Sequence, residues 1–178
     1  MKILNLLLAV GLLFCTSCTH VYTLQGFNAD SAQLGNAKNK KVAIIFSADK
    51  FARDITIAAD GHTFIFQEND RFYKQAYSSA LMGGVASTDF HTSHPGPGYD
   101  VYLYPGLSLE ISTSFTTKTC KATYSLEAKD AQGARLALES KSGTYNFVVI
   151  ANADNACKIA MLNTFDDVTY PVFKAIDG

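Results

Sequence analysis

The chain has 178 residues, of which 48% are hydrophobic and 17% are charged, and its formal net charge is −1. A disordered chain carries few apolar residues and a large net charge, so this composition excludes intrinsic disorder. The 15 Lys and Arg residues are balanced by 16 Asp and Glu residues, which argues against a nucleic-acid-binding protein. The length suits one domain with enough apolar side chains to bury a core.

The chain begins with a short apolar segment. Met1-Lys2 supplies a positive charge, and the run from Ile3 to Phe14 is apolar except for Asn5 and Gly11. A membrane-spanning helix needs about 20 apolar residues. This run is shorter and has the length of the hydrophobic region of a secretory signal. The sequence therefore predicts export.

Small residues and a cysteine follow this segment. Cys15-Thr16-Ser17-Cys18 resembles the lipobox of bacterial lipoproteins, although Cys15 stands where Leu is usual, and the resemblance covers only about the first twenty residues. It implies that residues 1–17 are a signal peptide cleaved before Cys18, whose thiol carries fatty acyl chains such as palmitate. In the Gram-negative family, an Asp after the lipidated cysteine favours inner-membrane retention. Thr19 therefore implies the outer membrane, with the protein facing the periplasm.

The same four residues allow two other interpretations. One is an ordinary secretory signal cleaved without lipidation, although no A-x-A-like site is present. The other is a thioredoxin-like C-x-x-C redox motif. Redox motifs of this kind belong at a strand-to-helix junction in a folded domain, whereas this one ends an apolar leader. The lipoprotein interpretation is preferred over both.

Two cysteines, Cys120 and Cys157, remain after processing. An even number of cysteines in an exported protein favours a disulfide. The alternative is a reactive thiol at Cys157, because Asp154 could begin a helix whose dipole lowers the pKa of the thiol. Lys158 is the one nearby basic residue that would support this activation, so the sequence favours the disulfide.

The pattern along the chain predicts the following elements. Residues 18–40 are polar and without periodicity, and are interpreted as a flexible tether. Apolar, β-rich runs predict strands at 41–46, 55–58 and 62–67, with a hairpin turn at Asp60-Gly61. A helix is expected from Arg71 onwards, capped by Asn69-Asp70 and ended by Gly83-Gly84.

Alternation predicts further strands at 107–112 and 121–129, followed by strands at 134–140 and 144–150. A second helix is expected over residues 155–170, ended or kinked by Pro171. The predicted fold class is α+β, with residues 41–178 forming a single domain. This domain is an antiparallel sheet of five to seven strands with two helices packed on one face.

The polar residues form no constellation that names a reaction. His91 and His94, with Asp89 and Asp100 nearby, could contribute to a metal site, but a solvated polar loop explains them better. Adjacent residues such as Asp166-Asp167 diverge by about 100° around a helix, which indicates a solvated face. No G-x-S-x-G or H-E-x-x-H motif is present. We therefore predict no catalytic residues, no metal and no cofactor.

Tyr99, Tyr102 and Tyr104 are the surface candidate of most interest, because tyrosines are enriched at interfaces. Alternation places Tyr102 and Tyr104 on one face of a strand, and Tyr99 on the other face with Val101 and Leu103. One face is expected to belong to the core, and the other could bind a partner protein or a glycan. Ordinary sheet packing is the simpler explanation.

These features favour a membrane-anchored envelope lipoprotein that is not an enzyme. Its expected role is that of an accessory or scaffold protein in an envelope assembly or transport system, with the membrane and an envelope protein as partners. The alternative is a module that binds a lipid, glycan or small hydrophobic ligand in a pocket lined by Phe64, Phe66 and tyrosines. An envelope hydrolase that uses His91 or His94 is less favoured.

Overall fold

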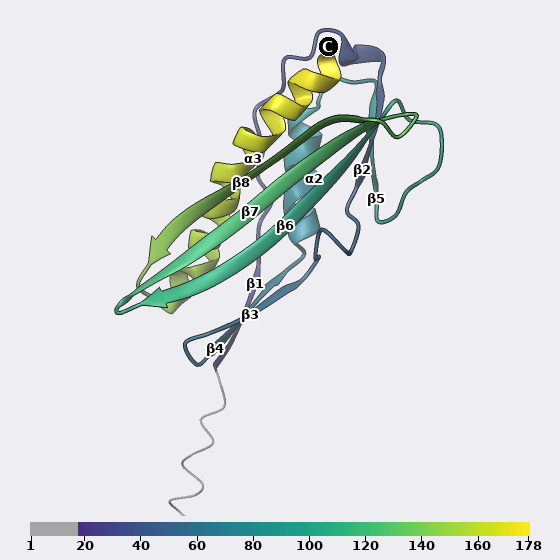
Figure 1. The fold of residues 1–178 in the computed structure, drawn as a ribbon. Coiled ribbons are helices and arrows are strands. Elements are labelled where there is room, and N and C mark those ends of the chain that lie inside the picture. The colour runs from purple at the N-terminus through teal and green to yellow at the C-terminus, as the bar shows by residue number, and fades with distance from the viewer. Residues whose placement is uncertain (1–17) are drawn as a thin grey trace, which may run out of the picture.

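Two β-sheets and two α-helices make up the computed structural model, which describes residues 18–178 (Figure 1). The signal peptide predicted for residues 1–17 lies outside the described residues. The five-stranded sheet has the order β5-β2-β6-β7-β8, with β5 at Ser87–His91, β2 at Lys41–Ile45, β6 at Val101–Ser114, β7 at Thr117–Asp130 and β8 at Arg135–Phe147. The three-stranded sheet has the order β1-β4-β3, with β1 at Cys18–Thr23, β4 at His62–Gln67 and β3 at Ile55–Ala59. The helices are α2 at Asn69–Ala80 and α3 at Ala153–Asp177, and two short 3-10 helices, η1 at Ala37–Asn39 and η2 at Ile150–Asn152, precede β2 and α3.

The prediction of one antiparallel sheet of five to seven strands is wrong, because the described strands form two sheets and both are mixed. Strands β6, β7 and β8 are antiparallel neighbours, but β2 runs parallel to both β5 and β6, and β1 runs parallel to β4. Parallel neighbours require a long crossover connection. Between β2 and β5 that crossover is formed by β3, β4 and α2. The α+β class of the prediction is confirmed.

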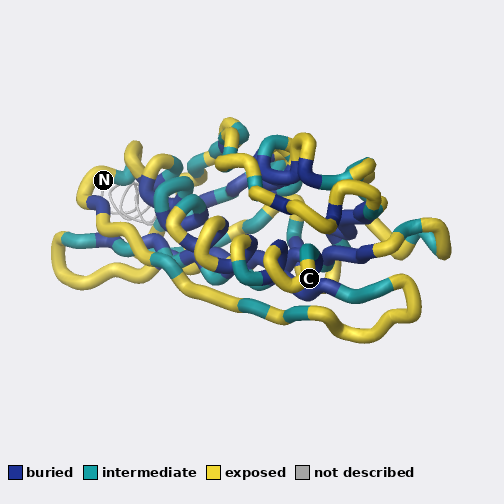
Figure 2. Tube along the Cα trace, turned by 90° about the horizontal axis from the view of Figure 1, so that it is seen from above, coloured by how far each residue is buried: buried dark blue, intermediate teal, exposed yellow. Residues whose placement is uncertain are grey.

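The two helices cover one face of the five-stranded sheet (Figure 1). On β7 the side chains that point to the helices are all buried, and they are Cys120, Ala122, Tyr124, Leu126 and Ala128. Tyr73 of α2 stacks on the Tyr124 ring with centroids 4.7 Å apart, and Phe165 of α3 lies 5.8 Å from the same ring. The core therefore lies between this face and the helices, and Figure 2 shows buried stretches inside the molecule with exposed loops around them.

Residues 18–40, predicted to be a flexible tether, are packed onto the domain instead. Strand β1 pairs with β4 over its whole length. After β1, the side chains of Leu24, Leu34 and Ala37 are buried in the main core. The tether prediction failed because this segment contributes single apolar side chains at irregular spacing, and such side chains give no periodic signal. In the structure residues 18–40 therefore belong to the domain.

Three predicted boundaries also differ from the structure. Helix α3 continues through Pro171 to Asp177, because its last turns bury Val172, Phe173 and Ile176 and this packing offsets the missing N–H. Helix α2 begins at Asn69, whose side chain does not cap it and instead donates hydrogen bonds to carbonyls of neighbouring segments. The strands predicted at 134–140 and 144–150 form the single strand β8, which ends at Phe147.

Candidate functional site

The candidate lipidation site, Cys18, is the first residue of β1. It is exposed, its thiol is free, and the strand register places it opposite His62 of β4. His20 Nε2 lies 3.1 Å from His62 Nδ1, and the Tyr22 hydroxyl donates a hydrogen bond of 3.1 Å to the Ile150 carbonyl. These contacts fix β1 to the rest of the domain. An acyl group on Cys18 would therefore be attached directly to the folded domain.

A second contact at this end of the molecule joins the two sheets. The turn between β3 and β4 holds Asp60, whose Oδ2 lies 2.8 Å from Nζ of Lys118 on β7. The Lys118 ammonium is largely buried, and its hydrogen bond and charge lower the pKa of the Asp60 carboxyl. As predicted, Asp60-Gly61 forms the turn, and both residues have the positive φ that such a turn requires.

The predicted disulfide is present. Cys120 of β7 and Cys157 of α3 are bonded, with their Cα atoms 5.2 Å apart. Both residues are fully buried, so the bond crosses the interface between α3 and the sheet. Because Cys157 is bonded in the structure, the alternative of a reactive thiol at the start of a helix is not supported.

Tyr99, Tyr102 and Tyr104 come together on the face of the five-stranded sheet opposite the helices. They pack around Ala43 and Ile45 of β2 in a small second cluster. Tyr99 was predicted to share a face with Val101 and Leu103, and this is wrong. It precedes the first residue of β6, where the alternation of the strand does not apply, and its ring lies 5.9 Å from that of Tyr102.

The loop over residues 91–100 covers part of this cluster. Tyr102 is buried, its hydroxyl donates a hydrogen bond of 2.8 Å to the Gly96 carbonyl, and His94 stacks on its ring. His91 Nε2 lies 3.0 Å from the Tyr99 hydroxyl. Tyr102 therefore has a packing role, and Tyr99 and Tyr104 are the half-buried members of the predicted patch.

His91 and Asp89 both lie by the Tyr99 hydroxyl, whereas His94 and Asp100 accept hydrogen bonds from backbone N–H groups. His94 Nδ1 accepts the Gly96 N–H at 3.0 Å, and Asp100 Oδ2 accepts the Lys41 N–H at 2.7 Å. Within residues 18–178 there is no group of three His, Cys, Asp or Glu side chains placed to hold a metal ion.

A charged cluster beside Tyr104 was not predicted. The carboxylate of Glu127, on β7, is only 7% exposed and lies 2.9 Å from Arg135 Nε, 3.2 Å from Lys50 Nζ and 3.7 Å from Lys129 Nζ. Burial alone would raise the pKa of Glu127, but the hydrogen bonds from Arg135 and Lys50 and the nearby charges lower it overall. Lys129 Nζ also lies 5.1 Å from the centroid of the Tyr104 ring.

Sequence reasoning missed this cluster for a topological reason. Alternation places Glu127 and Lys129 together on the polar face of β7, but Lys50 and Arg135 reach them from a loop and from β8. The cluster contains three cations, Lys50, Lys129 and Arg135, and one carboxylate, so its net charge is positive. It is therefore suited to contact an acidic group on a partner.

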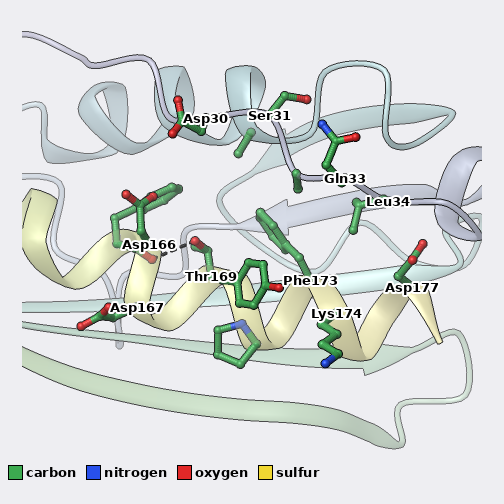
Figure 3. A pocket seen from close by; sticks show the side chains of 15 residues that line it. Asp30, Ser31, Gln33, Leu34, Asp166, Asp167, Thr169, Phe173, Lys174 and Asp177 are labelled. Atoms are coloured by element: carbon green, nitrogen blue, oxygen red, sulfur yellow. Dashed lines mark hydrogen bonds between the residues drawn. The ribbon is translucent and has the colours of Figure 1, made fainter.

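A groove of about 820 Å³ runs between residues 30–34 and the C-terminal half of α3 (Figure 3). Its apolar lining includes Leu34, Phe165 and Phe173. One end is acidic, with Asp30, Asp166 and Asp167, whereas Lys174 and Asp177 lie at the other end.

The electrostatics of the two ends differ. Asp166 is exposed, yet partial burial and the charges of Asp30 and Asp167 raise the pKa of its carboxyl. Asp177 accepts backbone N–H groups of Asn36 at 2.7 Å and Ala37 at 2.9 Å, and these bonds lower the pKa of its carboxyl below its ordinary value despite some desolvation. Asp177 therefore ties the end of α3 to the segment that forms the opposite wall.

The predicted ligand pocket beside Phe64 and Phe66 is not where the groove lies. Both side chains are fully buried, Phe64 against His20 and Phe66 against Tyr22. Neither lines the groove. The prediction failed because β1 covers these two side chains, and residues 18–23 were assigned to the tether.

Comparison with known proteins gives similarity in fold alone. No family model and no curated protein sequence matches the chain. Among solved structures, a Xanthomonas campestris protein of the DUF330 family has a TM-score of 0.62 at 8% identity, covering 88% of this chain and 96% of that one. A candidate lipoprotein from Caulobacter crescentus has a TM-score of 0.31 at 10% identity, covering 47% and 69%. The first similarity shows that the fold occurs nearly complete in a bacterial protein of known structure.

Within residues 18–178, neither α2 nor α3 combines the length and the hydropathy that a membrane-crossing helix needs.

Proposed function

We propose that the protein is an envelope lipoprotein, held in the membrane by acyl chains on Cys18, that acts as an accessory or scaffold protein of an envelope assembly or transport system. The observation that carries this proposal is the position of Cys18. The cysteine that ends the lipobox-like sequence is exposed and is also the first residue of β1. Cleavage immediately before it would leave the domain of residues 18–178 intact and the thiol accessible.

The proposal of a role without catalysis is supported by the contacts of the loop histidines. The hydrolase alternative requires His91 or His94 to meet a nucleophile and a carboxylate. His91 contacts Tyr99, and His94 contacts Tyr102 and Gly96. Asp89 also acts on the Tyr99 hydroxyl, but desolvation and the Asp89 charge raise the pKa of this hydroxyl, which makes it a poor nucleophile at neutral pH. The contacts of His94 are packing and turn contacts. The exposed features of the domain include a charged cluster and a groove, which suit binding to another molecule.

The anchor is tested by mass spectrometry of the protein extracted from membranes of a Gram-negative host. The mature chain is expected to begin at Cys18 and to carry the mass of the acyl chains, and Cys18→Ala should abolish both processing and membrane retention. Cys15→Ala is the matched control, because Cys15 lies in the segment to be removed and its loss should leave the mature protein unchanged. An unmodified N-terminus in membrane-associated wild-type protein would refute the anchor.

The accessory role is tested by cross-linking the native protein in its own cells, extracting it in detergent and identifying its partners by mass. Envelope proteins are expected to be recovered reproducibly with the wild type and to be lost with Cys18→Ala. Variants of the charged cluster, such as Arg135→Ala, should weaken recovery if the partner presents an acidic group. Absence of any partner at native abundance would contradict the accessory role.

A second candidate function is the binding of a small amphipathic ligand, favoured by the groove along α3. Its volume lies in the range of small-molecule sites, and its apolar lining ends at Lys174, which could hold an acidic head group. An organic extract of the protein purified from native membranes is expected to contain a ligand in molar equivalence. Ala32→Phe, which fills the groove, should abolish it, whereas Ala134→Phe at an exposed turn should not.

A further inference from the structure

Three large apolar side chains stand exposed close to one another. Phe115 is fully exposed at the turn between β6 and β7, and Val148 and Val149, which follow β8, are 65% and 58% exposed. The register of the sheet brings them together. Ser114 pairs with Thr117 around the turn, and Lys118 pairs with Phe147, the last residue of β8. We refer to Phe115, Val148 and Val149 as the apical patch.

The apical patch lies at the same end of the molecule as Cys18. Cys18 pairs with His62, which closes the β3–β4 turn, and Asp60 of that turn is bonded to Lys118. Tyr22 of β1 reaches the carbonyl of Ile150, directly after the two valines. In Figure 1 the start of β1, the β3–β4 turn and the β6–β7 turn all lie towards the lower end of the molecule.

The fold itself gives no reason for these side chains. Phe115 has φ 50°, a backbone conformation that favours Gly or Asn, and its side chain is fully exposed. The two segments that bear the patch are also without charge: residues 111–117 and 142–153 contain no Asp, Glu, Lys or Arg. Lys118 and Asp60, which lie next to these segments, form an ion pair with each other. An apolar patch on uncharged segments is typical of a contact with another apolar surface.

We propose that the apical patch inserts into the bilayer beside the acyl chains of Cys18 and fixes the orientation of the domain on the membrane. This inference rests on the proposed function, because the acylated cysteine brings the domain to the bilayer. No flexible linker separates Cys18 from β1, so a domain anchored there keeps this end close to the lipid. Apolar side chains then enter the boundary between head groups and acyl chains, where uncharged neighbours carry little desolvation cost.

The test uses the full-length protein, processed in cells, purified in detergent and reconstituted into vesicles of phosphatidylethanolamine and phosphatidylglycerol. In acylated protein the Cys18 thiol is blocked and Cys120 is bonded to Cys157, so an introduced cysteine is the one thiol left for labelling. The environment-sensitive dye NBD is attached at Phe115→Cys or Val149→Cys. Met82→Cys is the control, because Met82 is 70% exposed and lies just beyond the C-terminal end of α2.

NBD at residues 115 and 149 is expected to shift its emission to the blue and to be quenched several-fold more strongly by nitroxide-labelled lipids than NBD at residue 82. Equal quenching at residues 115 and 82 would overturn the inference. A blue shift at residue 115 without quenching by lipid would also overturn it, since the patch would then be covered by protein. The mass of each preparation is recorded first: missing acyl chains on Cys18 refute the proposed function, whereas acylated protein without quenching refutes only the inserted patch.

Discussion

The hydroxyl groups of Tyr77 on α2 and Tyr124 on β7 are hydrogen-bonded to each other in the centre of the core. Both side chains are fully buried, and burial raises the pKa of both hydroxyls well above the ordinary value for tyrosine. This pair joins the helical layer to the sheet. Next to it, Tyr73 stacks on Tyr124, but the Tyr73 hydroxyl has no hydrogen-bond partner within the described residues.

Two substitutions that each remove one hydroxyl should therefore have different effects. Tyr124→Phe leaves the buried Tyr77 hydroxyl unpaired and is expected to lower the free energy of unfolding by about 1–3 kcal/mol. Tyr73→Phe removes a hydroxyl that is buried without a partner, so it should be neutral or stabilising by about 1 kcal/mol. Urea unfolding of both variants in the same buffer measures the difference. Equal losses in the two variants would show that the Tyr73 hydroxyl has a partner in solution.

The cluster around Glu127 predicts a pH dependence of stability. The pKa of Glu127 is lowered in the folded protein, so the ionised carboxylate stabilises the fold at pH values above its ordinary, unfolded pKa. This contribution is lost as the pH falls from about 4.5 through the lowered folded pKa. Unfolding measured at neutral pH and across this acid range should show a smaller loss for Glu127→Gln than for the wild type. Glu110→Gln, which alters an exposed ion pair, is the control and should follow the wild-type curve.

The disulfide predicts a large effect of reduction. Cys120 and Cys157 are 37 residues apart, and a crosslink over such a loop stabilises a fold by about 3–4 kcal/mol in the chain-entropy model. The double variant Cys120→Ala/Cys157→Ala is expected to lose this amount, measured by urea unfolding against the oxidised wild type. Adding a reductant should lower the midpoint of the wild type and leave that of the double variant unchanged. A midpoint unaffected by reductant would mean that the crosslink makes no contribution to stability.

The structural elements that could be predicted from the sequence are those indicated by residues close together along the chain. The alternation on β7, the Asp60-Gly61 turn and the helix that follows β4 all depend on neighbouring residues, and all are present in the structure. The disulfide followed from the compartment implied by the lipobox-like sequence, not from any geometry. Each of these predictions needed only one stretch of chain or a count of cysteines.

What the sequence left unpredicted depends on distant segments. Strand β5, Ser87–His91, is five residues long and carries Asp89 at its centre, so it gives no strand signal until β2 lies beside it. Strand β1 is recognisable only through its pairing with β4. The charged cluster unites side chains from a loop, β7 and β8, and the groove unites residues 30–34 with α3. These sites are products of topology, which hydrophobic periodicity does not report.

The ion pair between Asp60 and Lys118 predicts a titration that reports how the two sheets are joined. Lys118→Met keeps the aliphatic bulk of the side chain but removes the ammonium group that lowers the pKa of Asp60. In this variant the pKa of Asp60, followed by the NMR shift of its carboxyl carbon, should rise towards the ordinary value for aspartate. The control is Lys121→Met. Lys121 lies on the same strand as Lys118 but is paired with Glu110, so its loss should leave the pKa of Asp60 unchanged.

The same substitution tests whether this contact couples the anchor to the apical patch. At the β3–β4 turn Asp60 accepts a hydrogen bond from the Lys118 ammonium, and Lys118 lies three residues from Phe115. Without the pair, the three-stranded sheet that begins at Cys18 is held less firmly against the β6–β7 turn. Hydrogen exchange of the amides at 58–62 and 114–118 should therefore become faster in Lys118→Met than in Lys121→Met. Identical exchange in the two variants would show that the Asp60–Lys118 pair does not couple the two sheets.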